Sequence, residues 1–251
     1  MLKFFRKIRK NLLIEGNFSK YLLYALGEII LVVIGILIAL QIDNWNSEKK
    51  DIEAEKGYLT SLKGEFSINL TSLENTMKEN EDLINALAKL SHLFNQDTLK
   101  NISEKEVALF LSPLAKEVVY YPSRGVTSDI ISSGNLKLIR NNELRQKIAS
   151  FDNTLKRIEN QEKITLDLRN NIMQITGQNG SFSILFAELE NRPKEESSFR
   201  PKSNKQLFSI LELENNLELY KQVTQTTNYT FYAGLRKDLK EILTMIEQEL
   251  N

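Results

Sequence analysis

The sequence predicts an all-α protein in which a single N-terminal transmembrane helix continues into a long antiparallel, extracytoplasmic helical bundle. An apolar run at residues 21–42 is long enough to cross a bilayer. Apolar residues elsewhere recur at three- and four-residue steps, and all four prolines fall into two short zones, which leaves long tracts for helices. We therefore expect a cytoplasmic basic segment (1–20), a transmembrane helix (21–42) and a bundle domain outside the cytoplasm (43–251).

The composition argues against several classes of protein and site. The chain of 251 residues has a formal net charge of zero, whereas a nucleic-acid-binding protein is usually basic. It has no cysteine, which excludes disulfides, thiolate metal ligands and cysteine nucleophiles. Residues 1–42 nevertheless hold six basic and two acidic residues, so the remainder is net acidic. This asymmetry indicates two different environments.

The basic N-terminal segment has two open interpretations. The stretch MLKFFRKIRKNLL places apolar residues along one side of a helix and basic residues along the other. Such a helix can lie on an anionic inner leaflet. Alternatively, the stretch is only a basic flank that sets the topology. In the first interpretation, the residues at the membrane surface are Lys3, Arg6, Lys7, Arg9 and Lys10.

The apolar run at 21–42 is predicted to be a retained membrane anchor. At ~1.5 Å per residue a helix of this length spans about 33 Å, close to the ~30 Å hydrocarbon core. No convincing signal-peptide cleavage site follows in LIALQIDNW. Because basic residues precede the run and a net acidic stretch follows it, the positive-inside rule predicts a cytoplasmic N-terminus. Trp45 is expected to anchor the helix at the opposite interface.

Glu28 is the one charged residue in this run. A charge near the bilayer centre costs ~2.5–3.5 kcal/mol on insertion scales, so its presence needs a reason. Glu28 can reach the cytoplasmic headgroups, or it can be protonated. A third interpretation is association with a second transmembrane helix, because small residues spaced four apart allow close approach. The residues on this predicted face are Gly27, Glu28, Leu31, Gly35 and Ala39.

Three long helices are predicted after the apolar run. Nothing in the sequence forces a stop between Ile42 and Phe94, so the transmembrane helix should continue as one rod. The second long helix should start at Asn141 or Asn142 and end near Gly177. The apolar face predicted for the last helix consists of Leu217, Tyr220, Thr224, Phe231, Leu235, Leu239, Ile242 and Ile246.

Shorter helices are predicted between the long ones. Ser103 and Glu106 have the spacing of a capping box. Thr127 is expected to cap the following short helix, and Gly134 is expected to end it.

Small residues suggest one close contact between helices of the bundle. Gly57, Ser61 and Gly64 lie along one strip of the first rod, and Ala233 and Gly234 lie together on the last helix. We predict that the two helices approach closely at these residues. The alternative is that the glycines are incidental.

Three stretches resemble a known family. They are FFRKIRKNLL, YALGEIILVVIGILIALQIDNWN and PSRGVTSDIISSGNLKLIRNNELR. They are similar to an uncharacterised family of single-pass membrane proteins of Gram-negative bacteria, described as a domain of unknown function. The resemblance implies an inner-membrane anchor and a periplasmic helical domain. It implies no activity and therefore no catalytic residue.

One polar constellation is a candidate ligand or partner site. The stretch YYPSRGVTSDIISSGNL combines two aromatic rings, an arginine that can hold a carboxylate or phosphate, and several hydroxyl groups. Its candidate residues are Tyr120, Tyr121, Arg124 and Asp129. The alternative is structural: Arg124 and Asp129 pair within the loop, and the hydroxyl groups cap helices. The lone His92 is expected to be neither a catalytic residue nor a metal ligand.

The sequence favours a binding protein over an enzyme. We find no metal-protease, phosphate-loop or serine-hydrolase motif, and we expect no cofactor and no metal. The predicted function is a membrane-anchored periplasmic scaffold or protein-interaction module whose partners are the lipid bilayer and either a second copy or another membrane protein, not nucleic acid. The alternative is a ligand-binding sensory subunit. With only about twenty cytoplasmic residues, it would have to signal through a partner membrane protein.

Overall fold

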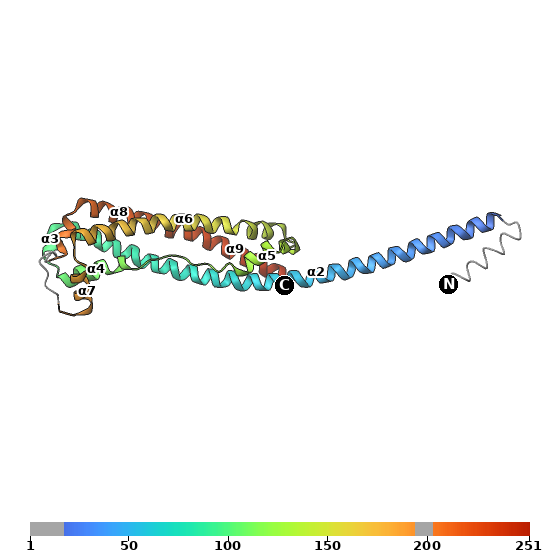
Figure 1. Cartoon of the computed structure of the whole chain (residues 1–251), viewed down its shortest axis with the longest axis horizontal. Helices are drawn as coiled ribbons and strands as arrows, with labels where there is room; N and C mark the ends of the chain where they lie inside the picture. The colour runs from blue at the N-terminus through green and yellow to red at the C-terminus, as the bar shows by residue number, and fades with distance from the viewer. Residues whose placement is uncertain (1–17, 194–202) are drawn as a thin grey trace. The chain divides into compact units, whose positions relative to one another are not determined.

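The computed structural model describes residues 18–193 and 203–251, and within them the chain is helical, with no strand. The predicted all-α fold class is confirmed. The chain divides into two units, Met1–Gly57 and Tyr58–Asn251, which we treat separately (Figure 1). The basic segment predicted at the membrane surface lies outside the described residues, including Lys3, Arg6, Lys7, Arg9 and Lys10.

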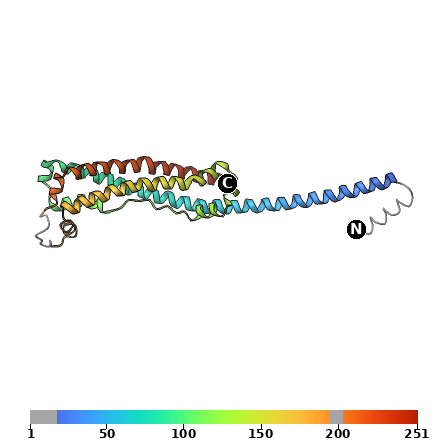
Figure 2. The ribbon, with the colours of Figure 1, turned by 45° about the horizontal axis from the view of Figure 1, so that its top comes forward.

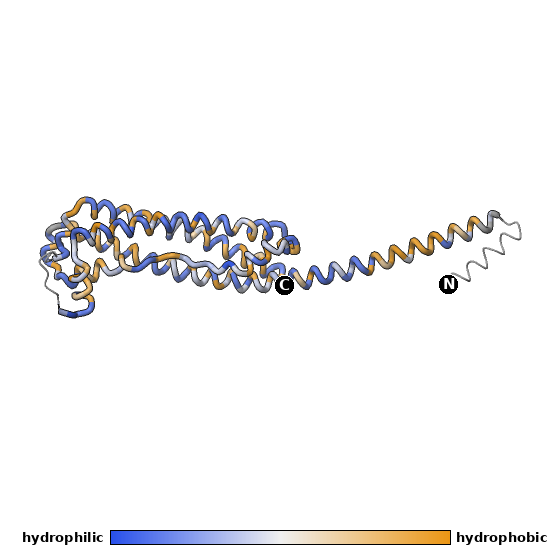
Figure 3. Tube along the Cα trace, viewed as in Figure 1, coloured by the Kyte–Doolittle hydropathy of each residue, from blue (hydrophilic) through white to orange (hydrophobic). Residues whose placement is uncertain are grey.

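Helix α2 (Phe18–Ser91) is continuous over 74 residues, which confirms the prediction of one unbroken rod. In the first unit its large apolar side chains from Leu22 to Ile42 are exposed. This stretch is strongly hydrophobic (Figure 3), and the helix is long and apolar enough to cross a membrane.

The second unit is built around the remainder of α2, whose core-facing residues follow a heptad pattern, with Glu65 and Ile84 buried beside this face. The steps alternate strictly between three and four residues, which is the spacing that lets one helix face stay against its neighbours. Most of these positions are apolar, but three are polar. The buried residues of this face are Leu59, Leu62, Phe66, Asn69, Leu73, Thr76, Asn80, Leu83, Leu87 and Leu90.

Helix α6 (Asn142–Asn179) repeats the same spacing and runs in the same direction as α2. Asn141 caps it, as predicted, by accepting a hydrogen bond from Leu144 N at 3.0 Å. The helix continues two residues beyond the predicted end at Gly177. The buried residues of its heptad face are Leu144, Ile148, Phe151, Leu155, Ile158, Glu162, Thr165, Ile172 and Thr176.

The parallel course of α2 and α6 requires the chain to return between them. The return passes through α3 (Gln96–Lys100) and α4 (Glu104–Leu111), a non-helical stretch at 117–124, and α5 (Gly125–Ser132). We call the stretch 117–124 the strap. It runs along one side of the bundle (Figure 2).

Two of the predicted caps in this return are confirmed and one is wrong. Ser103 and Glu106 form the capping box of α4, with Ser103 N donating to Glu106 Oε2 at 2.6 Å. Gly134 follows α5 with a φ of 72°, a left-handed conformation that suits glycine. Thr127 is not a cap, because α5 begins two residues earlier, at Gly125, and Thr127 lies inside the helix.

The last long rod runs antiparallel to the other two and contains a π-helix. It consists of α8 (Leu211–Thr226), the π-helix η5 (Thr227–Tyr232) and α9 (Ala233–Leu250). Thr227 and Asn228 are both buried, so the heptad pattern skips one residue here. A π-helical turn accommodates such an extra residue.

Because of this extra residue, the prediction that Phe231 lies in the core is wrong. Without it Phe231 would face the core, but the structure leaves Phe231 partly exposed and buries Tyr232 completely. After Tyr232 the heptad spacing resumes with Leu235 and Leu239.

The bundle contains two apolar cores separated by a polar belt. Phe66 packs edge-to-face on Phe151 in one core, at a centroid distance of 5.0 Å. Phe94 packs on Phe208 in the other, at 5.3 Å. The belt between them is formed by the buried residues Asn80, Thr165, Thr224, Thr227 and Asn228.

The predicted close contact between the small residues is wrong. Lys63 pairs with Glu247 at 2.9 Å and Lys240 pairs with Glu74 at 3.4 Å. These pairs fix a register in which Gly64 lies opposite the C-terminal end of α9, about three turns from Gly234. A Cβ at either glycine would meet nothing within 4 Å.

Candidate functional site

The strap is held by buried polar side chains of α2 and α6. Asn69 pairs with both backbone groups of Ser123: Ser123 N donates to Asn69 Oδ1 at 2.7 Å, and Asn69 Nδ2 donates to Ser123 O at 2.8 Å. Tyr120 N donates to Glu162 Oε1 at 2.9 Å, and the Tyr120 hydroxyl donates to Asn69 O at 3.2 Å. Asn69 and Glu162 therefore clamp the strap from both sides.

Glu65 caps helix α5 from another helix. Its buried carboxylate accepts hydrogen bonds from Val126 N at 2.7 Å, from Thr127 N at 2.9 Å and from the Thr127 hydroxyl at 2.5 Å. These donors are at the N-terminus of α5, where free N–H groups and the helix dipole favour a negative charge. Thr127 therefore supplies two of these donors from inside the helix.

Glu162 is a buried carboxyl group in the bundle interior. Burial raises its pKa, although the hydrogen bond from the Tyr232 hydroxyl at 2.6 Å and that from Tyr120 N both favour the charged form. Burial and the neighbouring Glu162 also raise the pKa of both tyrosines. Both phenols therefore remain protonated and can donate.

The four residues of the predicted constellation do not converge. Tyr120 is buried as part of the strap, whereas Tyr121 is 76% exposed. Asp129 is exposed and does not pair with Arg124. Arg124 instead pairs with Asp152, at 3.3 Å, and with Glu159, both on α6. The predicted pair within the loop is therefore replaced by a link between the strap and α6.

A groove lies between α5 and α6, beside Arg124. It has a volume of about 490 Å³, within the ~300–1,000 Å³ range of ligand sites. Phe151, Leu155 and Ile131 give it apolar surface. Among the described residues, the side chains of Ser128 and Asn153 at this groove have no hydrogen-bond partner. Sequence reasoning found the α5 side of this groove but missed Asn153, which is one ordinary exposed residue of a helix.

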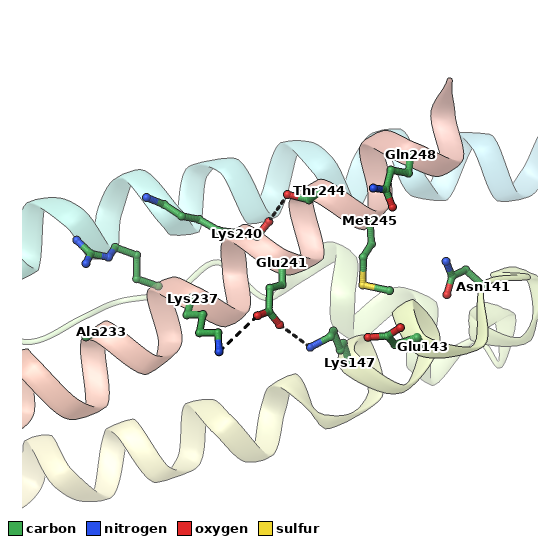
Figure 4. Close-up of a pocket in the computed structure, with 11 residues that line it drawn as sticks. Asn141, Glu143, Lys147, Ala233, Lys237, Lys240, Glu241, Thr244, Met245 and Gln248 are labelled. Carbon is green, nitrogen blue, oxygen red and sulfur yellow. Dashed lines mark hydrogen bonds and ion pairs between the residues drawn. The ribbon is translucent and has the colours of Figure 1, made fainter.

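A second groove, between α6 and α9, is lined by side chains that form ion pairs with one another (Figure 4). It has a volume of about 670 Å³. Lys147 pairs with Glu241 at 2.8 Å, and Lys237 pairs with the same carboxylate at 3.8 Å. The hydrogen bond between Lys147 and Glu241 raises the pKa of the lysine and lowers that of the glutamate. Its central charges are thus paired with one another.

A third, smaller pocket lies between α6, α7 (Phe182–Glu190) and residues 111–115 at the end of α4. Its volume is about 110 Å³ and its lining is almost entirely apolar. It is smaller than the usual ligand site.

The predicted transmembrane face lies in the first unit. A Cβ at Gly27 or at Gly35 would meet nothing within 4 Å, so both positions leave the helix surface open. Leu31, Ala39 and Trp45 are exposed, and Glu28 is partly exposed. No group of three or more potential metal ligands among His, Cys, Asp and Glu occurs in the described parts of the chain, and His92 is exposed.

Comparison with known proteins yields one match. Residues 28–190 match a family described as a family of unknown function, DUF6090. No curated protein and no solved structure matches the chain.

Proposed function

The chain belongs to the DUF6090 family, and from this premise, which supplies no activity, we propose that it is a membrane-anchored helical protein-interaction module. One observation carries the proposal: the apolar side chains from Leu22 to Ile42 are exposed, on a helix whose later residues enter a bundle. Leaving a large apolar side chain in water costs ~1.5–3 kcal/mol relative to burying it. Lipid would cover this surface.

The charges around the apolar stretch support an orientation. Basic residues before it and a net acidic stretch after it favour a cytoplasmic N-terminus and a periplasmic bundle at a bacterial inner membrane. We expect a reporter that is active only in the periplasm to be active when fused after Asn251. A silent periplasmic reporter together with an active cytoplasmic one would contradict this orientation.

The open face of the first unit supports association within the membrane. Gly35 and Ala39 would let a second copy of the helix approach closely, with Glu28 at the edge of the contact. We expect cross-linked dimers in membranes, weakened by Gly35→Leu and by Glu28→Leu. Val33→Leu, on the opposite side of the helix, is the matched control and should leave the dimer unchanged. Equal cross-linking of all four proteins would refute this contact.

A second candidate function is a sensory subunit that binds a ligand and signals through a partner membrane protein. The observation that favours it is the groove between α5 and α6, which has apolar surface and two side chains available for hydrogen bonding. Co-purification of a kinase or transporter from gently solubilised membranes would support this candidate. Self-association without such a partner would support the interaction module.

A further inference from the structure

The π-helix η5 contains the one residue by which the last rod exceeds its heptad spacing. The buried positions of α8 keep one phase up to Thr227, and those of α9 keep another phase back to Asn228. The two phases differ by one residue, which corresponds to about 100° around a helix. The extra residue therefore lies between Thr227 and Asn228, and both side chains are buried.

This position of the extra residue leaves two groups of one turn poorly placed. The side-chain oxygen of Asn228 is buried and accepts no hydrogen bond from any described residue, which is unfavourable. Phe231 is only partly buried, although it packs at the edge of an apolar core. Complete burial of its ring would be favourable.

A shift of the extra residue by one turn would relieve both defects. If the phase of α8 continued to Phe231 and the phase of α9 began at Tyr232, only residues 228–231 would rotate, by about 100°. Asn228 would then leave the core, and Phe231 would enter it four residues after Thr227. Tyr232 and the later core residues would keep their present phase.

Two hydrogen bonds to α2 favour the position seen in the structure. Asn228 Nδ2 donates to Glu81 Oε2 at 3.2 Å, and the Tyr229 hydroxyl donates to the same oxygen at 2.6 Å. Both donors lie in the turn that would rotate, so the shift breaks both bonds. It must also fit Phe231 beside Tyr232, which is completely buried, and crowding in a packed core is unfavourable. The shifted position is therefore the less populated one.

We propose that η5 is a two-position conformational switch between the last rod and α2. In the major position Asn228 is buried and the rod is bonded to Glu81. In the minor position Phe231 is buried and the Glu81 carboxylate is released from the rod. The contacts that change are on α2, the helix that also carries the apolar stretch of the first unit. The inference goes beyond the proposed function and does not depend on it, because the switching residues all belong to the second unit.

The test uses the full chain in detergent micelles and a fluorine probe. The chain has no cysteine, so a single introduced cysteine can carry a unique trifluoromethyl label. Thr230→Cys places the label on an exposed residue of the rotating turn, and Gln222→Cys, on an exposed residue of α8, is the matched control. Fluorine NMR should show two exchanging environments at position 230, as separate resonances or as relaxation dispersion, and one environment at position 222.

Two further variants should shift the populations in opposite directions. Glu81→Ala removes the acceptor that holds Asn228 and Tyr229, and should raise the minor population by about threefold. Phe231→Asn removes the apolar ring that the minor position buries, and should lower this population by about threefold. Neither Glu81 nor Phe231 is completely buried, so circular dichroism of both variants should match that of wild type.

Three results would overturn the proposal. The first is a single environment at position 230 in both the wild type and Glu81→Ala. The second is a shift of the populations in the same direction by Glu81→Ala and Phe231→Asn, since this would indicate a general loosening of the turn. The third is exchange of equal size at position 222. The membrane cross-linking and the reporter fusion use other residues, so their outcome and that of this test are independent.

Discussion

At the scale of single residues, the bundle depends on polar side chains placed where a heptad would normally have apolar ones. Asn69 and Glu162 lie on the buried faces of α2 and α6, and both bind the strap. A buried polar group is costly unless it is paired, so each residue is tied to its partner on the strap.

Asn69→Ala should destabilise the protein by about 1–3 kcal/mol, because it removes two hydrogen bonds and leaves both backbone groups of Ser123 without their partner. Thermal unfolding of the full chain in detergent, followed by circular dichroism, measures the loss. Asn160→Ala is the control and should melt like wild type. An unchanged melting temperature for Asn69→Ala would show that water replaces the clamp at no cost.

The raised pKa of Glu162 predicts a pH-dependent stability. Its ordinary value is 4.5, and in the folded state burial raises the pKa, so the folded protein holds this proton more tightly than the unfolded chain. Stability should therefore fall as the pH rises from 4.5 through the folded pKa. Glu162→Gln keeps an acceptor for Tyr120 N and the Tyr232 hydroxyl but cannot titrate.

Melting temperatures of wild type and Glu162→Gln across this range test the sign. The stability of wild type relative to the variant should decrease with increasing pH. A difference that stays constant would show that Glu162 has the same pKa in the folded and unfolded states.

At the scale of elements, the π-helix η5 corrects the phase of the last rod. The rod has one residue more here than the heptad spacing requires, so Thr227 and Asn228 are both buried. Beside them, Asn80 Nδ2 donates a hydrogen bond to Thr224 O at 3.3 Å. Asn228 Oδ1 is buried and has no hydrogen-bond partner within the described structure. A buried acceptor without a partner lowers the stability of the fold.

Deleting Thr230, an exposed residue of η5, should turn this region into continuous α-helix and keep α8 and α9 in their present phases. We expect a melting temperature at least as high as that of wild type. Deleting Gln222, an exposed residue of α8, is the matched control. That deletion moves the preceding core residues out of phase and should lower the melting temperature strongly. Equal destabilisation by both deletions would argue against a heptad skip.

The elements that sequence reasoning predicted are those with local signals. The unbroken helix α2, the capping box at Ser103 and the glycine after α5 each depend on neighbouring residues. The cap of α5 was missed because its carboxylate, Glu65, is more than 60 positions away from Thr127. The π-helix was missed because Phe231 and Tyr232 are both large aromatic residues, so periodicity alone could not choose between them.

The candidate site was predicted only in part, for a related reason. The stretch at 120–136 supplies one wall of the α5–α6 groove, and α6 supplies the other. Only the folded chain brings Ser128 and Asn153 to the same groove, and neither residue lies in a recognisable motif.

At the scale of the whole molecule, the second unit contains its own apolar cores. All core residues of both clusters lie at or after Leu59. A chain that begins at Ser47 and lacks the apolar stretch should therefore be soluble and helical, and should unfold cooperatively. Circular dichroism and thermal melting test this. A truncated chain that aggregates, or melts without a transition, would show that the bundle needs the first unit.

The strap also has a consequence for the order in which the chain folds. Its clamps join Ser123 to a residue 54 positions earlier and Tyr120 to a residue 42 positions later, so both helices must be in place before it can dock. If docking follows the rate-limiting step, Asn69→Ala should accelerate unfolding and leave the refolding rate almost unchanged. The strap contacts would then determine the unfolding rate of the bundle, while contacts among the long helices determine its folding rate.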